Sequence, residues 1–253
     1  MMEKIDFQQI YEKHESYEKR RIDGQYREDY LEDIDCWKNK YLLKVLPENQ
    51  KFNKILDIGC GTGDLIAKFP LNIDFSNRYG LDISDKNIKF AQKKYPEVNW
   101  ICGTIDDLNS DMDYSLIILS DILEHVEDDI ELLKKSSCLS KYLLVNIPME
   151  KCYSTRNREY GPNDIAGHLR SYDYFDVLKL IKKANLKIKR YIVKYISKES
   201  FWQKRFSRDY FSKYNFNQTL IRLPVFIYKI LRFKLAFKLY PSNFFGFLEK
   251  NNI

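Results

Sequence analysis

The sequence predicts an α/β fold built on a doubly wound, mainly parallel sheet. Short apolar runs alternate with helical segments between residues 53 and 148, which is typical of βαβ units. One run, Ile55–Ile58, stops at three glycines spaced by two. The next run ends at the acid Asp82, about one crossover helix further along the chain. Strand ends that carry such residues predict a ligand site at the carboxyl edge of the sheet.

The glycine-rich turn is the strongest functional motif. Gly59, Gly61 and Gly63 let the backbone approach a ligand, because no Cβ stands in the way. We expect a helix from about Asp64 that directs its N-terminal amides at that ligand. Asp57, at the strand end, would repel a pyrophosphate but suits an ammonium or sulfonium group. The third glycine comes one residue too early for G-x-G-x-x-G, and no Gly-Lys-Ser/Thr ending follows.

An acid followed by x-G-x-G-x-G resembles the loop of class I S-adenosylmethionine-dependent methyltransferases. The resemblance implies S-adenosylmethionine as cofactor and a Rossmann-like sheet of seven strands, of which the last runs antiparallel. Asp82, at the end of the second strand, would accept both ribose hydroxyls, and Ile83 would face the adenine. The expected cofactor contacts are Asp57, Gly59, Cys60, Gly61, Gly63, Asp82, Ile83, Thr104, Ile105 and Ser120.

The third and fourth strands carry the next motifs. Residues 100–108 resemble the family's adenine loop, but Gly103-Thr104-Ile105 stands where Gly-Asp-Ala is common, so Asp106 or backbone groups must replace the missing acceptor. Residues 114–119 read as the fourth strand, and Leu-Glu-His-Val at 123–126 resembles the family's small-molecule branch, types 11, 12 and 23. The Asp/Asn-Pro-Pro-Tyr signature of base-amino methylation is missing, since Asn-Ile-Pro at 146–148 follows the fifth strand.

Histidine is the natural base for a hydroxyl acceptor, and the chain has three. His14 reads as a solvated helix residue. We expect His125 to begin the helix after the fourth strand, either beside the transferred methyl or bracing the loop. His168 precedes a helix, at a place where the family frequently has a histidine facing the acceptor. Asp121 is the third catalytic candidate.

Arg156, Arg158 and Arg170 share the loop-like insertion 149–171. Guanidinium groups bind phosphate and carboxylate in a bidentate manner. These arginines would therefore clamp an anionic acceptor, unless they are simply solvated on a surface loop.

The chain divides into a helical cap (1–46), a cofactor-binding core (47–198), a basic aromatic insertion (199–243), and a final strand with its tail (244–253). In the cap, Tyr26, Tyr30 and Trp37 either close the site or pack between helices. The insertion reads as a helical substrate lid. Residues 182–250 hold 17 Lys and Arg against three acids, within a chain of net charge +6.

Composition fits a cytoplasmic protein without a metal site. The five cysteines are odd in number and scattered, with no C-x-x-C, which argues against disulfides and zinc and for a reducing cytosol. Residues 1–30 lack a secretory signal, and no uncharged apolar run approaches a membrane span.

Three functions compete. The first is methyl transfer to a hydroxyl of a phosphorylated or sugar-type precursor of a surface polysaccharide or secondary metabolite. The second is a lipid or quinone methyltransferase, with the basic aromatic insertion in peripheral contact with an anionic membrane. RNA methylation ranks last, because no RNA-binding appendage is recognisable. A cofactor-binding protein without turnover is also compatible with the fold.

Overall fold

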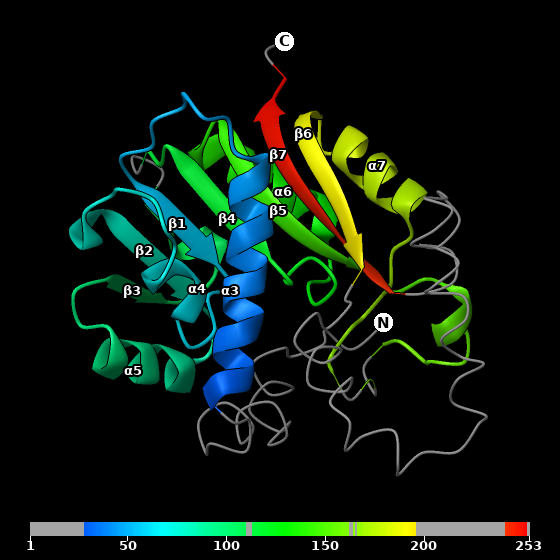
Figure 1. The fold of residues 1–253 in the computed structure, drawn as a ribbon, viewed down its shortest axis with the longest axis horizontal. Helices are drawn as coiled ribbons and strands as arrows, with labels where there is room; N and C mark the ends of the chain where they lie inside the picture. Colours follow the sequence, from blue (N-terminus) through cyan, green and yellow to red (C-terminus); the bar gives the residue numbers. More distant parts are fainter. Residues whose placement is uncertain (1–27, 110–112, 162–163, 165, 196–240, 252–253) are drawn as a thin grey trace, which may run out of the picture.

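The computed structural model describes residues 28–109, 113–161, 164, 166–195 and 241–251. The elements, whose arrangement is drawn in Figure 1, are α3 (Glu28–Val45), β1 (Ile55–Ile58), α4 (Asp64–Ala67), η1 (Phe75–Asn77), β2 (Arg78–Asp82), α5 (Asp85–Lys94), β3 (Asn99–Cys102), η2 (Ile105–Asp107), β4 (Leu116–Ser120), α6 (Asp129–Leu139), β5 (Tyr142–Met149), η3 (Tyr153–Thr155), α7 (Tyr174–Lys183), β6 (Leu186–Tyr195) and β7 (Ser242–Lys250).

The strands form one seven-stranded sheet in the order β3-β2-β1-β4-β5-β7-β6. The first five pair in parallel, whereas β7 runs antiparallel to both β5 and β6. The strand order reverses between β1 and β4: the chain adds β2 and β3 on one side of β1, and β4 and β5 on the other. Ile58 of β1 and Leu119 of β4 are register partners at this point. The predicted fold class is confirmed, and a ligand site is expected beside this switch point.

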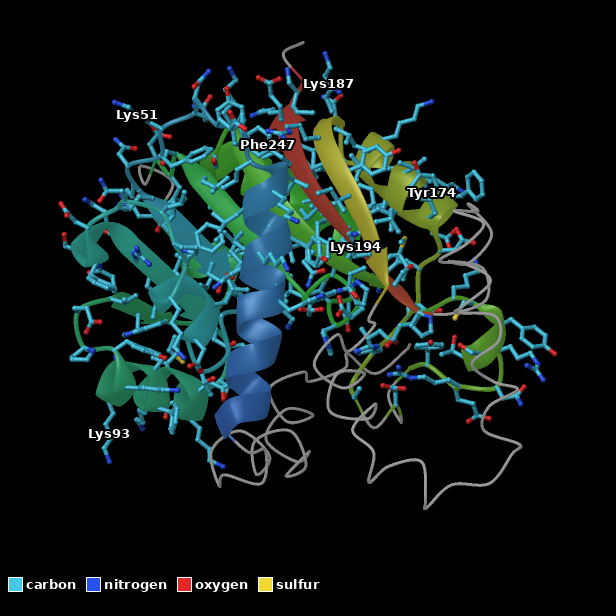
Figure 2. The ribbon with its side chains drawn as sticks, viewed as in Figure 1. Lys51, Lys93, Tyr174, Lys187, Lys194 and Phe247 are labelled. Atoms are coloured by element: carbon cyan, nitrogen blue, oxygen red, sulfur yellow. The ribbon has the colours of Figure 1, made fainter. Side chains whose placement is uncertain are left out.

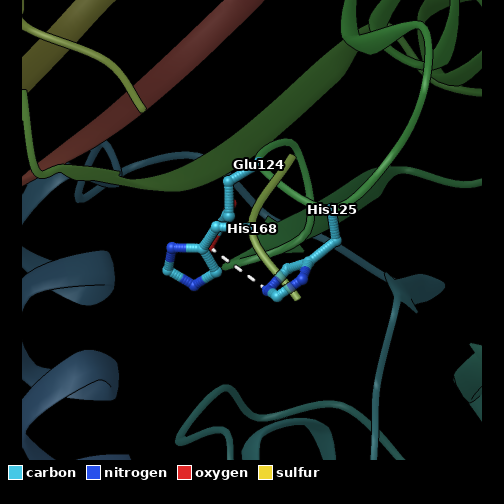
Figure 3. Close-up of side chains that lie close together, drawn as sticks. All are labelled: Glu124, His125 and His168. Atoms are coloured by element: carbon cyan, nitrogen blue, oxygen red, sulfur yellow. Dashed lines mark ion pairs between the residues drawn. The ribbon is translucent and has the colours of Figure 1, made fainter. Parts of the chain in front are cut away.

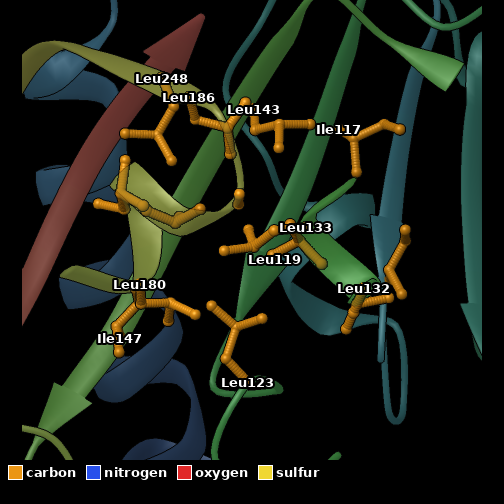
Figure 4. Packing of buried hydrophobic residues seen from close by; sticks show 14 of the residues in the cluster. Ile117, Leu119, Leu123, Leu132, Leu133, Leu143, Ile147, Leu180, Leu186 and Leu248 are labelled. Carbon is orange, nitrogen blue, oxygen red and sulfur yellow. The ribbon is translucent and has the colours of Figure 1, made fainter. Parts of the chain in front are cut away.

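Helices cover both faces of the sheet because its strands alternate two sets of apolar side chains. On one face, Leu116 and Ile118 of β4 pack with α3 and α4. On the other, Ile117 and Leu119 pack with α6 and α7, as Figure 4 shows. Ile117 and Leu119 are fully buried there. This two-sided core holds the strand ends, and with them the site, in fixed positions.

Helix α3, at the beginning of the described chain, packs against β7. Trp37 and Tyr41 contact Phe245 with ring centroids 5.3 and 5.4 Å apart. Trp37 is therefore partly buried and packs against the core, which is the packing alternative considered for it. Charged side chains lie outside, and Figure 2 shows Lys51, Lys93 and Lys187 at the rim. None of the described helices is long and apolar enough to cross a membrane.

The helix expected from Asp64 is present and short. It starts at the expected residue, but α4 ends after four residues, at Ala67. Pro70 prevents a longer helix, because it has no N–H to donate and disfavours a helical Phe69. Arg78, which is 5% exposed, binds the carbonyl groups left without helical partners. Its guanidinium donates at 2.9–3.3 Å to the carbonyl oxygens of residues 66, 67, 69, 71 and 73.

The prediction that a helix begins at His125 is wrong. Residues 121–127 form turns, and α6 begins only at Asp129. Asp128 caps this helix, because its carboxylate accepts from the backbone N–H of Glu131 at 2.8 Å. His125 is therefore held by a turn at the carboxyl end of β4.

Two predicted segments lie largely outside the described residues. Residues 1–27 of the helical cap and residues 196–240, which include most of the basic insertion, belong to this group. Tyr26 and its expected role over the cofactor fall there. The helix expected after His168 and the final strand are present as α7 and β7.

We predict that Arg78→Met lowers the free energy of unfolding by about 3 kcal/mol, since it leaves several buried carbonyl groups without donors. Urea denaturation followed by circular dichroism measures the change. Lys89→Met is the control, because Lys89 pairs with Asp85 on an exposed helix face. Equal midpoints for the two variants would contradict the structural role of Arg78.

Candidate functional site

A cavity of about 540 Å³ opens at the carboxyl ends of β1, β2 and β4. It brings together most residues that the sequence singled out. Those in its wall are Asp57, Gly59, Cys60, Gly61, Asp82, Ile83, Thr104, Ile105, Ser120, Asp121 and His125. Gly63 and His168 are not among the lining residues. A cavity of this size holds a ligand of a few tens of atoms.

The glycine loop is fixed against the end of β2. Gly59 and Gly61 have φ of +74° and +54°, which favour glycine. The N–H of Gly61 donates to Asp82 Oδ2 at 2.7 Å, and the N–H of Gly59 donates to the Leu81 carbonyl at 2.8 Å. Asp82 Oδ1 accepts from the backbone N–H of Ser84 at 2.9 Å. The acid at the end of β2 thus orders the loop as well as facing the cavity.

The third glycine has a packing role. Gly63 has φ +81°, and a Cβ on it would lie 2.2 Å from Trp100. A Cβ on Gly80 would lie 2.4 Å from the same indole. The indole donates to the Tyr95 carbonyl at 2.9 Å. Sequence reasoning did not assign Trp100 to the site, and the two small residues facing it were the available signal.

The deep end of the cavity is electronegative. Burial, with the nearby carboxylates of Asp82 and Asp57, raises the pKa of the Cys60 thiol well above its usual value. Cys60 is therefore an uncharged thiol in the loop. Asp57 is 2% exposed and lies in the cavity wall. Such a wall favours a cationic group in the ligand.

Other acids in the wall have cationic partners. Asp64 lies 2.7 Å from Lys94 Nζ. Burial would raise the pKa of Asp64, but hydrogen bonds from Lys94 and Tyr95 outweigh it and lower that pKa. Asp106, which the sequence offered as a substitute adenine acceptor, forms a 2.5 Å ion pair with Lys135. Two acids of the cavity wall are thus paired with lysines.

The loop after β3 is preorganised by a capping box. The N–H of Thr104 donates to Asp107 Oδ2 at 2.7 Å, and this closes η2. Burial is slight here, and hydrogen bonds from Thr104 lower the pKa of Asp107. Thr104, Ile105 and Ile83 present a partly apolar wall opposite the glycine loop.

Asp121 is held in a strained backbone conformation at the end of β4. Its φ is +54°, and its Oδ2 lies 2.7 Å from Lys38 and 2.9 Å from the amide nitrogen of Asn146. Burial would raise the pKa of Asp121, but Lys38 overcomes this and lowers it. Asp121 is thus an ionised positioning group. Lys38 comes from α3, and no sequence motif pointed to it.

His125, His168 and Glu124 form a compact cluster at the edge of the cavity, shown in Figure 3. The two imidazole rings meet edge to face with centroids 4.7 Å apart. Burial and the neighbouring His168 lower the pKa of His125 to about 4. Burial and Asp121 raise the pKa of Glu124 well above its usual value. The structure therefore brings together the two predicted histidines and adds an acid that sequence reasoning left unassigned.

The three arginines are not one cluster. Arg158 is committed to Asp164, at 2.8 and 2.9 Å, and to Glu150 at 2.6 Å. Arg170 lies 3.1 Å from Asp129 Oδ2 and donates to the backbone on the α6 side. Arg156 stacks over the ring of Tyr153, 4.0 Å from its centroid, and is exposed.

A second cavity, of about 630 Å³, is lined by Arg156 and Arg158 but not by Arg170. Glu150 also lies in its wall and is bonded to His168 at 3.0 Å. The histidine cluster thus connects the two cavities, with His125 lining the first.

Comparison with known proteins gives a consistent picture. Residues 55–139 match a family model described as a methyltransferase domain. A ubiquinone biosynthesis O-methyltransferase from Rickettsia felis is 38% identical over 79 residues, which are 30% of this chain and 32% of that protein. The corresponding protein of Rickettsia akari is 33% identical over 100 residues, covering 38% and 36%. The matches span about a third of the length of these relatives.

A solved S-adenosylmethionine-dependent methyltransferase from Thermotoga maritima has the same fold. It is 16% identical with a TM-score of 0.57, and the superposition covers 97% of this chain and all of that one.

We predict that Cys60 is alkylated far more slowly than the exposed Cys138. The thiolate is the nucleophile, and each unit of raised pKa leaves about a tenth as much of it. Iodoacetamide labelling at pH 8 with peptide mass spectrometry gives both rates. Similar rates at the two cysteines would contradict the buried, electronegative loop.

Proposed function

Because residues 55–139 form a methyltransferase domain within a class I fold, we propose that the chain transfers a methyl group from S-adenosylmethionine to a small-molecule hydroxyl. The observation that carries this proposal is the hydrogen bond between the turn after β1 and the end of β2. Gly61 donates to Asp82 there, and Asp57 lies in the same cavity wall. The activity, acceptor and partners of the whole chain are parts of the proposal.

The cavity fits the proposed cofactor in three places. Asp82, at the end of β2, accepts the ribose hydroxyls. The electronegative wall near Asp57 takes the ammonium and sulfonium charges. Ile83, Thr104 and Ile105 face the adenine, which the partly apolar wall opposite the loop accommodates. Ser120, at the end of β4, lies toward the reacting methyl.

The bound cofactor supplies an electrophilic methyl group on a sulfonium. The chain's residues align the acceptor oxygen in line with the carbon–sulfur bond and exclude water. An oxygen–carbon bond forms as the carbon–sulfur bond breaks, and the bonding pair stays on sulfur. The acceptor's proton leaves at the His125–His168 cluster, where Asp121 positions the adjoining turn.

The first candidate acceptor is a hydroxyl group on a phosphorylated or sugar-type molecule. A phosphorylated or sugar-type precursor of a surface polysaccharide or secondary metabolite would use Arg156, because Arg158 and Arg170 already have acidic partners. The pairing of these two arginines weakens an anionic clamp. The residues 199–243 would cover the acceptor as a lid.

A quinone-type or lipid acceptor is the second candidate, favoured by the names of the two Rickettsia relatives. Its proposed membrane contact rests on the basic insertion, which lies outside the described residues. The described cysteines, Cys60, Cys102, Cys138 and Cys152, are free thiols, which supports a cytoplasmic location.

Calorimetric titration of S-adenosylhomocysteine tests the cofactor site. We expect micromolar binding that Asp82→Asn weakens by roughly 30-fold, since hydrogen bonds to a charged acceptor are worth about 2 kcal/mol. Asp85→Asn is the matched control, because Asp85 lies exposed three residues further on. No binding by the unaltered chain, or equal loss in both variants, would remove the basis for the proposal.

Homocysteine release over a panel of phenolic, quinol, sugar and sugar-phosphate acceptors tests turnover. His168→Asn should lower kcat by about 100-fold or more while leaving the affinity for S-adenosylhomocysteine unchanged. His14→Asn serves as the control, since the sequence reads His14 as a solvated helix residue. Undiminished turnover in His168→Asn would exclude the histidine cluster from the reaction.

A further inference from the structure

The second cavity, beside the loop that follows β5, gathers exposed aromatic side chains. Of the four large apolar side chains that are exposed in the described chain, Tyr153 and Phe175 line this cavity, with exposed fractions of 62% and 63%. Tyr160 adds a third ring to the wall. Single exposed aromatic residues are ordinary, but several around one cavity mark a binding surface. Flat ring faces favour a flat ring as the ligand.

Two of the three basic side chains in the wall of this cavity already have acidic partners. Arg158 lies 2.6 Å from a carboxylate oxygen of Glu150 and 2.8 Å from one of Asp164. Lys151 lies 2.8 Å from a carboxylate oxygen of Asp176. These pairs hold the wall in shape, and their charges cancel.

Arg156 is the third basic side chain, and no acid of the described chain pairs with it. Its guanidinium lies over the ring of Tyr153, 4.0 Å from the centroid, and donates to the carbonyl oxygen of the same residue at 3.0 Å. The stacking orients the guanidinium while the side chain remains exposed, so further N–H groups can donate to a ligand. One unpaired cation in the wall matches one anionic group in the ligand.

A sugar fits this wall less well than an aromatic ring, because its hydroxyl groups need several polar partners. The hydroxyl of Thr155 already donates to the backbone carbonyl of Glu150, and the hydroxyl of Tyr160 lies 3.5 Å from the same oxygen. The carboxylate of Asp173 caps α7 and accepts from the backbone N–H of Phe175 at 2.8 Å. The wall therefore offers ring faces and one cation to a ligand.

We propose that the second cavity binds a planar aromatic ring that carries one carboxylate. Arg156 contacts the carboxylate, and Tyr153 and Phe175 contact the ring. The volume of about 630 Å³ admits one or two fused rings. A phosphate monoester, with up to two negative charges, would leave one charge unmatched, because Lys151 and Arg158 are paired elsewhere.

The second cavity is joined to the cofactor cavity by the chain around Ser171, which lines the second cavity. On one side of this residue, Arg170 donates to the carbonyl oxygen of Glu127 at 2.6 Å, and Glu127 lines the cofactor cavity. On the other side, Tyr172 donates to the carbonyl oxygen of Leu123 at 2.9 Å. These contacts fix the two cavities relative to each other. The role of the aromatic acid as methyl acceptor rests on the proposed function, whereas its binding does not.

Fluorescence titration with 6-hydroxy-2-naphthoate tests the site without relying on turnover. The full chain is titrated with this probe, both with and without saturating S-adenosylhomocysteine. The analogue 2-naphthol lacks the carboxylate, and trans-4-hydroxycyclohexanecarboxylate lacks the aromatic ring. We expect the naphthoate to bind at least about tenfold more tightly than either analogue, and glucose 6-phosphate not to displace it.

Two variants test the contacts. Arg156→Met should weaken naphthoate binding by about tenfold and leave 2-naphthol binding unchanged, and Phe175→Ala should weaken both by roughly threefold or more. Lys93→Met and Phe75→Ala are the matched controls, an exposed cation and an exposed ring outside the cavity wall. Both controls should bind the naphthoate like the unaltered chain.

A parallel titration with S-adenosylhomocysteine shows that each variant is folded and separates the two proposals. No naphthoate binding by the unaltered chain, equal binding of 2-naphthol, displacement by glucose 6-phosphate, or unchanged affinity in Arg156→Met would overturn the aromatic acid site. Naphthoate binding without S-adenosylhomocysteine binding would keep this site and overturn the proposed function. The reverse result would keep the proposed function and remove this class of acceptor.

Discussion

One hydrogen bond, from the N–H of Gly61 to the carboxylate of Asp82, organises the candidate site. It ties the turn after β1 to the end of β2, and parallel pairing brings these ends to one edge. The bond forms with Gly61 in a left-handed conformation and a carboxyl oxygen of Asp82 turned toward the loop. The same carboxylate, with Asp57, makes the nearby wall electronegative, as the raised pKa of Cys60 reports. Loop shape and ligand preference thus arise from one interaction.

The polarity of the site follows from which acids have basic partners. Asp64 and Asp121 face Lys94 and Lys38. Neither carboxylate oxygen of Glu124 has a hydrogen-bond partner in the described chain, and burial and Asp121 raise the pKa of this acid. The site therefore offers two surroundings for carboxylates: one in which a lysine pairs with the acid, and one in which burial favours the protonated form.

Local sequence was enough to predict the sheet, the loop and Asp82, because each depends on residues close in the chain. Strand alternation and three glycines are such signals. The burial of Arg78 beside the end of α4 was not predicted, because its bonds to the carbonyl groups there are tertiary contacts eleven residues further along the chain. Lys38 was missed because its contact with Asp121 is tertiary. The arginines were expected to act together because they are close in sequence. In the structure Arg158 pairs with Asp164 and Arg170 pairs with Asp129.

The position of β7 between β5 and β6 governs the order in which the sheet can assemble. Among the described strands β6 pairs with β7 alone, so it stays detached until residues far along the chain have arrived. Closing so long a segment costs little extra entropy but takes time. Helix α3 also cannot complete its packing until β7 is in place, since Trp37 packs on Phe245. The half that carries the glycine loop can therefore form first, and the half with α3 locks onto it last.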